Sequence, residues 1–148
     1  MSDIEKNILA LDYGAKSVGA AVTDGLGLSA VTLPVIFRER ETKLRRTCAV
    51  IEQIIRERGI RLIVMGLPFN MDGSEGERAE KTREFAKMLE RRTGISVEFQ
   101  DERLTTVEAG EILKLQEKNG AGRRERIDSV AAAVILEDYL HSHRTPED

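Results

Sequence analysis

The sequence predicts an α/β fold in which a mixed five-stranded sheet carries helices on both faces. Two observations lead to this prediction. Near the N-terminus, three short apolar runs are joined by short glycine-containing turns, as in an antiparallel three-stranded meander. Further along, helical and strand patterns alternate, and a strand-helix-strand connection makes its two strands parallel neighbours. The length of 148 residues suits a single domain, residues 1–148, with a polar tail from about residue 142.

The meander begins with a predicted hairpin. Its strands, Ile8–Leu11 and Val18–Val22, are rich in small and β-branched residues. Gly25–Gly27 then turns the chain toward a third strand, Ser29–Phe37. Pro34 lies inside that third strand and cannot donate a hydrogen bond to a neighbour, so we expect it at an edge of the sheet.

A helix is predicted over Glu39–Gly59, because apolar residues recur at spacings of four, three and four, at Leu44, Cys48, Ile51 and Ile55. The continuous apolar run in Arg61–Gly66 is typical of a central strand that is covered on both faces. A loop, Gly66–Gly73, should follow it.

The next helix is predicted to begin at Ser74, since Glu77 lies at the capping-box spacing, and to end at Gly94. A fifth strand, Ile95–Phe99, comes next. The remaining chain is predicted to form a helix from about Thr106 to Leu115, a polar mobile loop and a last helix; the loop is Gln116–Arg126 and the last helix is Ile127–His141.

Composition excludes several classes of protein. A net charge of −3 argues against a purely electrostatic nucleic-acid binder, and the absence of tryptophan argues against a platform of stacked bases. The single cysteine, Cys48, excludes an internal disulfide and is expected to be a small core residue. No apolar run is long enough to span a membrane, and the first residues lack the layout of a signal peptide, so we expect a cytoplasmic protein.

Three carboxylates fall where the predicted parallel strands end. Asp12 ends the first strand, Glu102 follows the fifth strand, and Asp128 opens the last helix. In open α/β sheets the ligand crevice lies beyond the carboxyl ends of the parallel strands, so we expect these acids at one rim. Asp24, which precedes Gly25, is instead expected to be a turn residue.

Three carboxylates around a crevice suit one or two Mg²⁺ or Mn²⁺ ions, which can assist phosphodiester hydrolysis without a histidine. Each acid also has a structural interpretation. Asp12 would cap the turn at Gly14, Glu102 would be a solvated loop residue, and Asp128 would favour a helix start through the helix dipole. His141 and His143 are left out of the predicted site.

Four stretches resemble the YqgF/RuvX family, the Holliday-junction-resolvase-like nucleases that are also described as pre-16S ribosomal RNA nucleases. They are LDYG with VGAAVTD over 11–24, GLPFNMDGSEGERA over 66–79, DERLTTVEA over 101–109 and RIDSVAAAVIL over 126–136. The resemblance implies an RNase H-like fold and metal-dependent phosphodiester cleavage, in rRNA processing or junction resolution. It places the family's acidic triad on Asp12, Glu102 and Asp128.

The implied partner is RNA or branched DNA. Basic side chains should fringe the crevice and hold phosphates without reading sequence, and we expect them at Lys16, Arg103, Arg123, Arg124 and Arg126. Asn70, at the end of the fourth strand, should lie beside the site. Ser17 stands where similar sequences commonly carry a basic residue, and the adjacent Lys16 could substitute for it. A homodimer is compatible with the sequence, although no dimer stripe is evident.

Two other functions stay open at this point. The hairpin with Asp12 also resembles the phosphate loop of the actin and sugar-kinase superfamily, but those enzymes bind nucleotide between two such domains. Alternatively, the chain could be a non-catalytic binding module for nucleic acid or protein, acting in transcription or ribosome assembly. Metal-dependent cleavage that is lost when Asp12 is changed would separate these functions.

Overall fold

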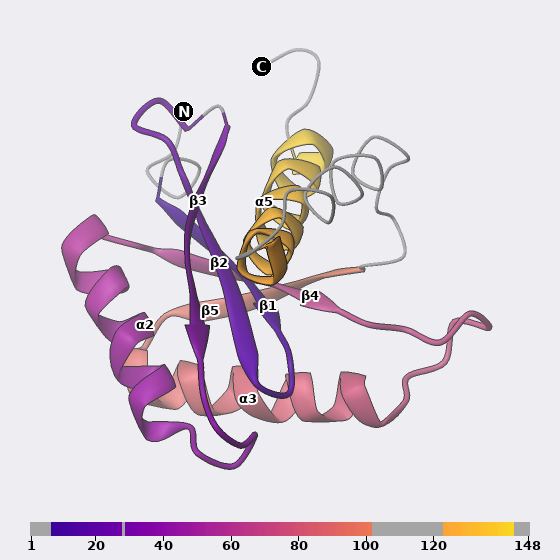
Figure 1. The fold of residues 1–148 in the computed structure, drawn as a ribbon. Helices are drawn as coiled ribbons and strands as arrows, with labels where there is room; N and C mark the ends of the chain where they lie inside the picture. Colours follow the sequence, from indigo (N-terminus) through magenta and orange to yellow (C-terminus); the bar gives the residue numbers. More distant parts are fainter. Residues whose placement is uncertain (1–6, 28, 102–122, 144–148) are drawn as a thin grey trace.

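The structure is a computed structural model that describes residues 7–27, 29–101 and 123–143, with only the backbone described for 123–129. It contains a five-stranded sheet in the order β3-β2-β1-β4-β5 (Figure 1). The strands are β1 (Ile8–Tyr13), β2 (Ser17–Thr23), β3 (Ala30–Phe37), β4 (Leu62–Leu67) and β5 (Ser96–Asp101). β1, β2 and β3 pair antiparallel, and β4 and β5 extend the sheet as parallel strands, as predicted.

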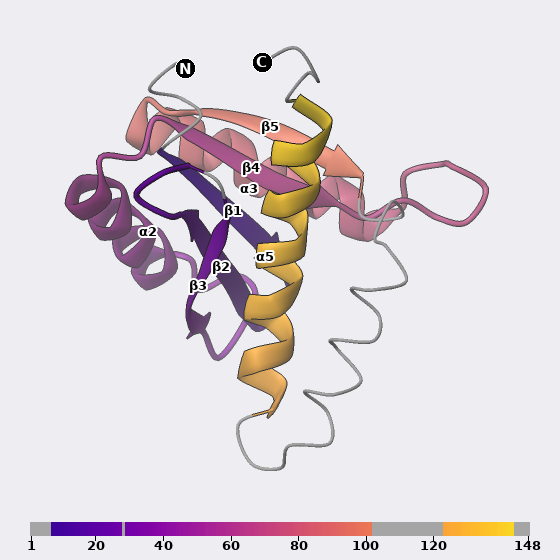
Figure 2. The same cartoon turned by 90° about the horizontal axis from the view of Figure 1, so that it is seen from above.

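Helices cover both faces of this sheet, which confirms the predicted architecture (Figure 2). They are α2 (Arg45–Arg58), α3 (Glu77–Thr93) and α5 (Arg123–His143). Helices α2 and α3 lie on one face and α5 lies on the other. In the described part of the chain, no helix is long and apolar enough to cross a membrane.

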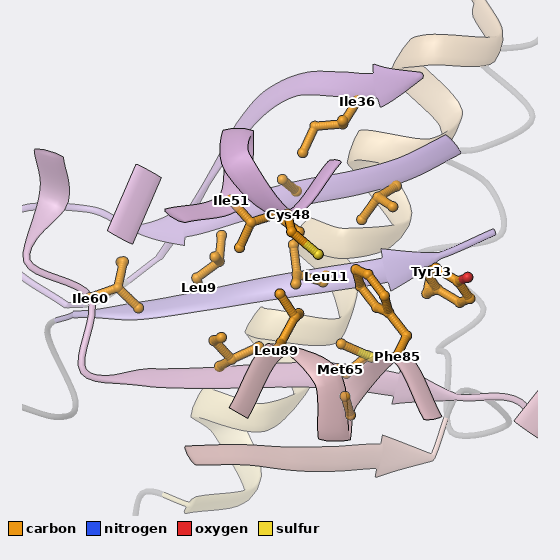
Figure 3. Close-up of a cluster of buried hydrophobic side chains, with 14 of the residues drawn as sticks. Leu9, Leu11, Tyr13, Ile36, Cys48, Ile51, Ile60, Met65, Phe85 and Leu89 are labelled. Atoms are coloured by element: carbon orange, nitrogen blue, oxygen red, sulfur yellow. The ribbon is translucent and has the colours of Figure 1, made fainter. Parts of the chain in front are cut away.

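Side chains along β1 alternate between two separate cores. Leu9, Leu11 and Tyr13 join the larger core beneath α2 and α3, where the apolar side chains of the sheet and both helices meet (Figure 3). Ile8 and Ala10 point to the opposite face and join the smaller core beneath α5. Burial on both faces explains why this strand is almost wholly apolar.

The edge strand β3 contains a bulge. Val18 and Ala20 of β2 pair with Ile36 and Leu33, so that two residues of β3 lie opposite one residue of β2. Pro34 is one of these two residues. This position confirms the expected edge strand, because a bulge at an edge tolerates a residue that lacks a backbone donor.

Two predicted helix starts are wrong. The residues from Glu39 to Leu44 form turns, and α2 begins only at Arg45, although the apolar stripe from Leu44 to Ile55 packs against the core as expected. The start of α3 is Glu77, with Gly76 at the N-cap position and no side-chain cap.

Ser74 therefore does not cap α3. Its hydroxyl donates to Asp72 Oδ1 at 2.6 Å and accepts a hydrogen bond from Asn70 Nδ2 at 3.0 Å. Both partners belong to the loop that precedes the helix, and this local network competes successfully with the capping box.

The last helix is longer than predicted. Because α5 begins at Arg123, residues 123–126 are helical rather than part of a loop, and Ser142 at the other end lies within the helix rather than in a frayed tail. The Ser142 hydroxyl donates to the Asp138 carbonyl at 2.7 Å. Residues 116–122 of the expected loop, and the whole expected helix from Thr106 to Leu115, lie outside the described residues.

A polar cluster closes the larger core at the end of β1. The Tyr13 ring stacks on Phe85 with a centroid distance of 4.3 Å. The guanidinium groups of Arg38 and Arg78 also lie near the Tyr13 ring, at 4.8 and 5.3 Å from its centroid. One aromatic ring thus joins the end of β1 to the residue after β3 and to α3.

Glu41 balances the charge of this cluster. Its carboxylate pairs with Arg78 Nη1 at 2.7 Å and with Lys81 Nζ at 3.4 Å. Burial raises the pKa of Glu41, but the hydrogen bonds from Arg78 and Lys81 outweigh it, so that the pKa lies below its ordinary value. These bonds tie the segment before α2 to α3, which explains why Glu41 does not extend α2.

We expect Glu41→Gln to lower the free energy of unfolding by about 1 kcal/mol near neutral pH, since the pairs are only partly shielded from water. The carboxyl pKa is lower in the folded state than its unfolded value of about 4.3, so this contribution is complete above that value and is lost as the pH falls through the folded-state pKa. Urea unfolding from about pH 7 to about pH 3 measures the difference.

The matched control is Glu39→Gln, because Glu39 pairs with Lys43 at 3.5 Å in an exposed position. It should change the unfolding free energy little at any pH. A loss for Glu41→Gln that is equally large at both ends of the pH range would contradict the assigned ion pairs.

Candidate active site at the carboxyl ends of the parallel strands

Asp12 is the penultimate residue of β1 and lies at the rim where the parallel strands end. Since β1 pairs parallel with β4, and β4 with β5, the carboxyl ends of all three strands lie along one edge of the sheet. Side chains of Ile8 and Ala10 join the core beneath α5. By strand alternation, Asp12 lies on the same face as α5.

On both strands next to β1, the residue beside Asp12 is a glycine. Asp12 pairs with Gly19 of β2, and Gly66 of β4 follows Met65, the partner of Leu11. Neither glycine has a positive φ, so the backbone conformation does not require glycine at these positions. Glycine within a strand often marks a place where a ligand or another backbone approaches closely. Asp12 itself is half-buried, and glycine lies beside it on both neighbouring strands.

Backbone hydrogen bonds, one within the turn and one from Arg38, hold the turn after Asp12. The Gly14 N–H donates to the Ser17 carbonyl at 2.8 Å, and the Lys16 carbonyl accepts a hydrogen bond from the Arg38 N–H at 2.9 Å. The Lys16 side chain is exposed at this rim. Asp24 is a turn residue, as expected: its carboxylate accepts hydrogen bonds from the Leu26 N–H and the Ser29 hydroxyl.

The structure describes the other two acids only through their neighbours. Glu102 directly follows Asp101, which ends β5 at the same rim, but Glu102 itself lies outside the described residues. Asp128 belongs to α5, and its side chain is also outside them. Ala132, one helical turn further along α5, packs in the core that contains Ala10 of β1. The helix that carries Asp128 therefore crosses the face on which Asp12 lies.

Asn70 is engaged in the loop over residues 68–76, which projects from the body of the molecule after β4 (Figure 2). Its N–H donates to the Ser74 carbonyl at 2.8 Å, and its side-chain amide lies against Gly76. A Cβ at Gly76 would come within 3.1 Å of Asn70 Oδ1. Asn70 thus shapes the loop, and the exposed amide still lies beyond the end of β4.

Among the predicted basic residues, Arg103 lies outside the described residues. Arg123, Arg124 and Arg126 lie in the first turns of α5, with side chains that the structure does not describe. Residues with described side chains include no group of three Asp, Glu, His or Cys that could hold a metal. Asp12 is the one member of the predicted triad with a described side chain, and its carboxylate oxygens are donors that Mg²⁺ and Mn²⁺ prefer.

Sequence reasoning missed Arg38 and the role of Tyr13. Tyr13 lies beside Asp12 in the chain but points to the opposite face, into the larger core. Burial raises the pKa of the Tyr13 hydroxyl, Arg38 lowers it and Glu41 raises it, and the net shift is upward, so Tyr13 stays neutral near neutral pH. The sequence alone does not identify Arg38, because the pairing of β3 with β2 brings this residue to the turn between β1 and β2.

Comparison with known proteins places the chain in a family. The sequence profile of the RuvX family, described as Holliday junction resolvase, matches residues 6–142. A protein of Lachnospira eligens named "Putative pre-16S rRNA nuclease" is 50% identical over 135 residues, which cover 91% of this chain and 96% of the relative. A protein of Myxococcus xanthus with the same name is 45% identical over 139 residues, covering 94% and 90%.

The fold has solved counterparts. T. thermophilus RuvC in complex with a Holliday junction substrate aligns with a TM-score of 0.59 and 15% identity, over 92% of this chain and 95% of the RuvC chain. This likeness shows the RNase H-like fold, as the resemblance to the family implied. A profile match over most of the length, together with relatives of this identity, shows that the chain belongs to the RuvX family of nucleases.

Proposed function

We propose that this protein is a metal-dependent endonuclease that hydrolyses phosphodiester bonds of structured RNA, with the precursor of 16S ribosomal RNA as its substrate. The relatives' names support RNA. Branched DNA is the second candidate, because the family profile carries the description of a Holliday junction resolvase. A junction needs two cuts, so this second substrate would require a homodimer.

The observation that carries the proposal is the position of Asp12. Its carboxylate lies at the carboxyl ends of the parallel strands, on the face that α5 crosses, with glycine on both neighbouring strands. In this proposal Glu102 and Asp128 complete the site. The end of β5 at the same rim supports Glu102, and the course of α5 over this face supports Asp128.

The proposed cofactor is one or two Mg²⁺ or Mn²⁺ ions, held by Asp12, Glu102 and Asp128. Three carboxylates form a hard oxygen donor set that suits these cations. When bound, such ions supply Lewis acidity for the phosphoryl oxygens and lower the pKa of a bound water. The chain's own contribution is to hold the acids at one rim and to leave the sheet backbone open beside Asp12.

Basic residues are proposed to hold the nucleic-acid backbone around this site. Lys16 is exposed in the turn after Asp12, and Arg123, Arg124 and Arg126 open the helix that carries Asp128. Arg103 and Asn70 are proposed to contact the same substrate from the ends of β5 and β4. Contacts with phosphates orient the substrate without reading its sequence.

The proposal is tested by a cleavage screen with Mg²⁺ or Mn²⁺ that compares structured precursor RNA, four-way junction DNA and duplex DNA. Cleavage of the RNA supports the first substrate, and paired cuts in the junction support the second. Binding without cleavage of any of the three, under all metal conditions, would favour the non-catalytic module.

We expect Asp12→Asn to abolish cleavage, with a loss of at least about 100-fold, because losing a metal ligand removes several kcal/mol of stabilisation. Stability without metal should hold or rise, since clustered carboxylates repel one another. Cleavage rates and thermal unfolding measure both effects. Asp24→Asn is the control, because Asp24 serves a turn at the other end of β2. Full activity of Asp12→Asn would reject the triad.

We also expect Glu102→Gln and Asp128→Asn to lose cleavage to a similar extent, and the double variant to be little worse than either single variant. Residues that form one metal site act as a unit, and their effects are strongly non-additive. Rates for the single and double variants decide the point. Losses that multiply in the double variant would show that the two acids serve different sites.

The arginines of α5 should act through substrate phosphates. We expect Arg123→Ala with Arg124→Ala to weaken binding to all sequences, and to reduce the slope of log affinity against log salt by ~0.7–0.9 for each lost contact. The fold should not suffer, because cations at a helix N-terminus oppose the helix dipole.

Binding over a range of salt concentrations, with Ca²⁺ in place of Mg²⁺ to prevent turnover, measures this slope. The control is Arg56→Ala with Arg58→Ala, two exposed arginines in the last turn of α2. An equal slope for the α5 variant and the wild type would show that Arg123 and Arg124 do not contact substrate phosphates.

A further inference from the structure

Arg38 directs its hydrogen bonds and its ring contact to one short segment beside Asp12. It is the first residue after β3, and its N–H donates to the Lys16 carbonyl at 2.9 Å. Its guanidinium group donates through Nη2 to the Gly14 carbonyl and lies over the Tyr13 ring. Arg38 thus holds the backbone at both ends of the turn that follows Asp12.

These contacts are made in a buried position. Arg38 is only 9% exposed, and its Nε and Nη1 have no hydrogen-bond partner in the described part of the chain. A buried cation without a paired carboxylate is unfavourable for stability. Stability of the fold alone therefore does not account for Arg38, and a buried group that lacks partners calls for another explanation.

Arg78 provides the contrast within the same cluster. Its guanidinium also lies near the Tyr13 ring, but it pairs with Glu41 at 2.7 Å and its side chain is 38% exposed. The ion pair with Glu41 is a sufficient structural reason for Arg78. Both arginines contact the Tyr13 ring, but Arg78 also pairs with a carboxylate, whereas Arg38 also donates to backbone carbonyl groups of the turn.

Asp12 directly precedes the backbone that Arg38 holds. Gly19 is the residue of β2 that pairs with Asp12, and Gly66 of β4 follows Met65, the partner of Leu11. Tyr13 and Gly14, the next residues of the chain, are the ones that Arg38 contacts. Arg38 thus holds the backbone immediately after Asp12.

We propose that Arg38 is a positioning residue: from the opposite face of the sheet it clamps the turn after β1 and so holds the Asp12 carboxylate in the orientation that binds a divalent cation. This inference rests on the proposed function, in which Asp12 is a metal ligand. Residues that orient a metal ligand typically change metal affinity by about 10–100-fold when they are replaced.

The test is calorimetric titration of the full chain with Mn²⁺, without nucleic acid, combined with thermal unfolding. Arg38→Met keeps the length of the side chain and removes its charge and donors. We expect the Mn²⁺ affinity to fall by about tenfold, while Tm holds or rises because an unpaired buried cation is lost. A merely structural arginine would lower Tm and leave Mn²⁺ affinity unchanged.

Two further variants sharpen the result. Arg78→Met is the matched control: it should lower Tm through loss of the Glu41 pair and keep the Mn²⁺ affinity of the wild type. Arg38→Ala should regain Mn²⁺ affinity when guanidinium ion is added at low concentration, and an equal concentration of sodium ion should not restore it. Failure of the guanidinium rescue, with a low Tm for both Arg38 variants, would overturn the assignment.

Asp12→Asn separates this inference from the proposed function. If Asp12→Asn weakens Mn²⁺ binding and Arg38→Met does not, the positioning role is wrong while the metal site stands. If Asp12→Asn and the wild type bind Mn²⁺ equally, Asp12 is not a ligand, and both the proposed site and the role of Arg38 are overturned.

Discussion

The parallel pairing of β1 with β4 is the constraint on which the rest of the structure depends. It brings the carboxyl end of β1 to the same edge as the ends of β4 and β5. The antiparallel pairing of β1 with β2 then requires the chain to turn back at that edge. A carboxylate in the last residues of β1 therefore lies beside the turn to β2, at the edge where β4 and β5 also end.

Strand alternation directs successive side chains at the end of β1 to opposite faces of the sheet. Asp12 lies on the face of α5, whereas Tyr13, the next residue, enters the larger core and gathers the polar cluster around its ring. On the α5 face, small residues such as Ala10, Ala21 and Ala132 meet in the core. Small side chains on both sides let a helix approach a sheet closely, which keeps α5 near the strand that carries Asp12.

The sequence was sufficient to predict the five strands, their directions and the apolar stripe of α2, because these follow from hydrophobic periodicity and connection rules. It failed at the starts of α2 and α3. There, Glu41 and Ser74 have helix-compatible patterns but bind partners outside the helix, and such partners are known only once the chain is folded.

The position of Asp12 at the carboxyl end of a buried strand could be predicted from the sequence, while its role as a ligand stays a prediction. The flanking of Asp12 by Gly19 and Gly66 depends on strand register, which the sequence did not reveal. The contact of Arg38 with the turn after β1 could not be predicted from the sequence, because the pairing of β3 with β2 brings together residues that are far apart in the chain.

The bulge at Pro34 also affects how the exposed edge of the sheet can interact with other molecules. Edge strand β3 exposes apolar side chains, with Val31 44% and Phe37 43% exposed, and such an edge could recruit strands from other molecules. The irregular backbone and the missing donor of Pro34 interrupt the ladder that an incoming strand would need. The bulge thus disfavours the addition of a strand from another molecule to this edge.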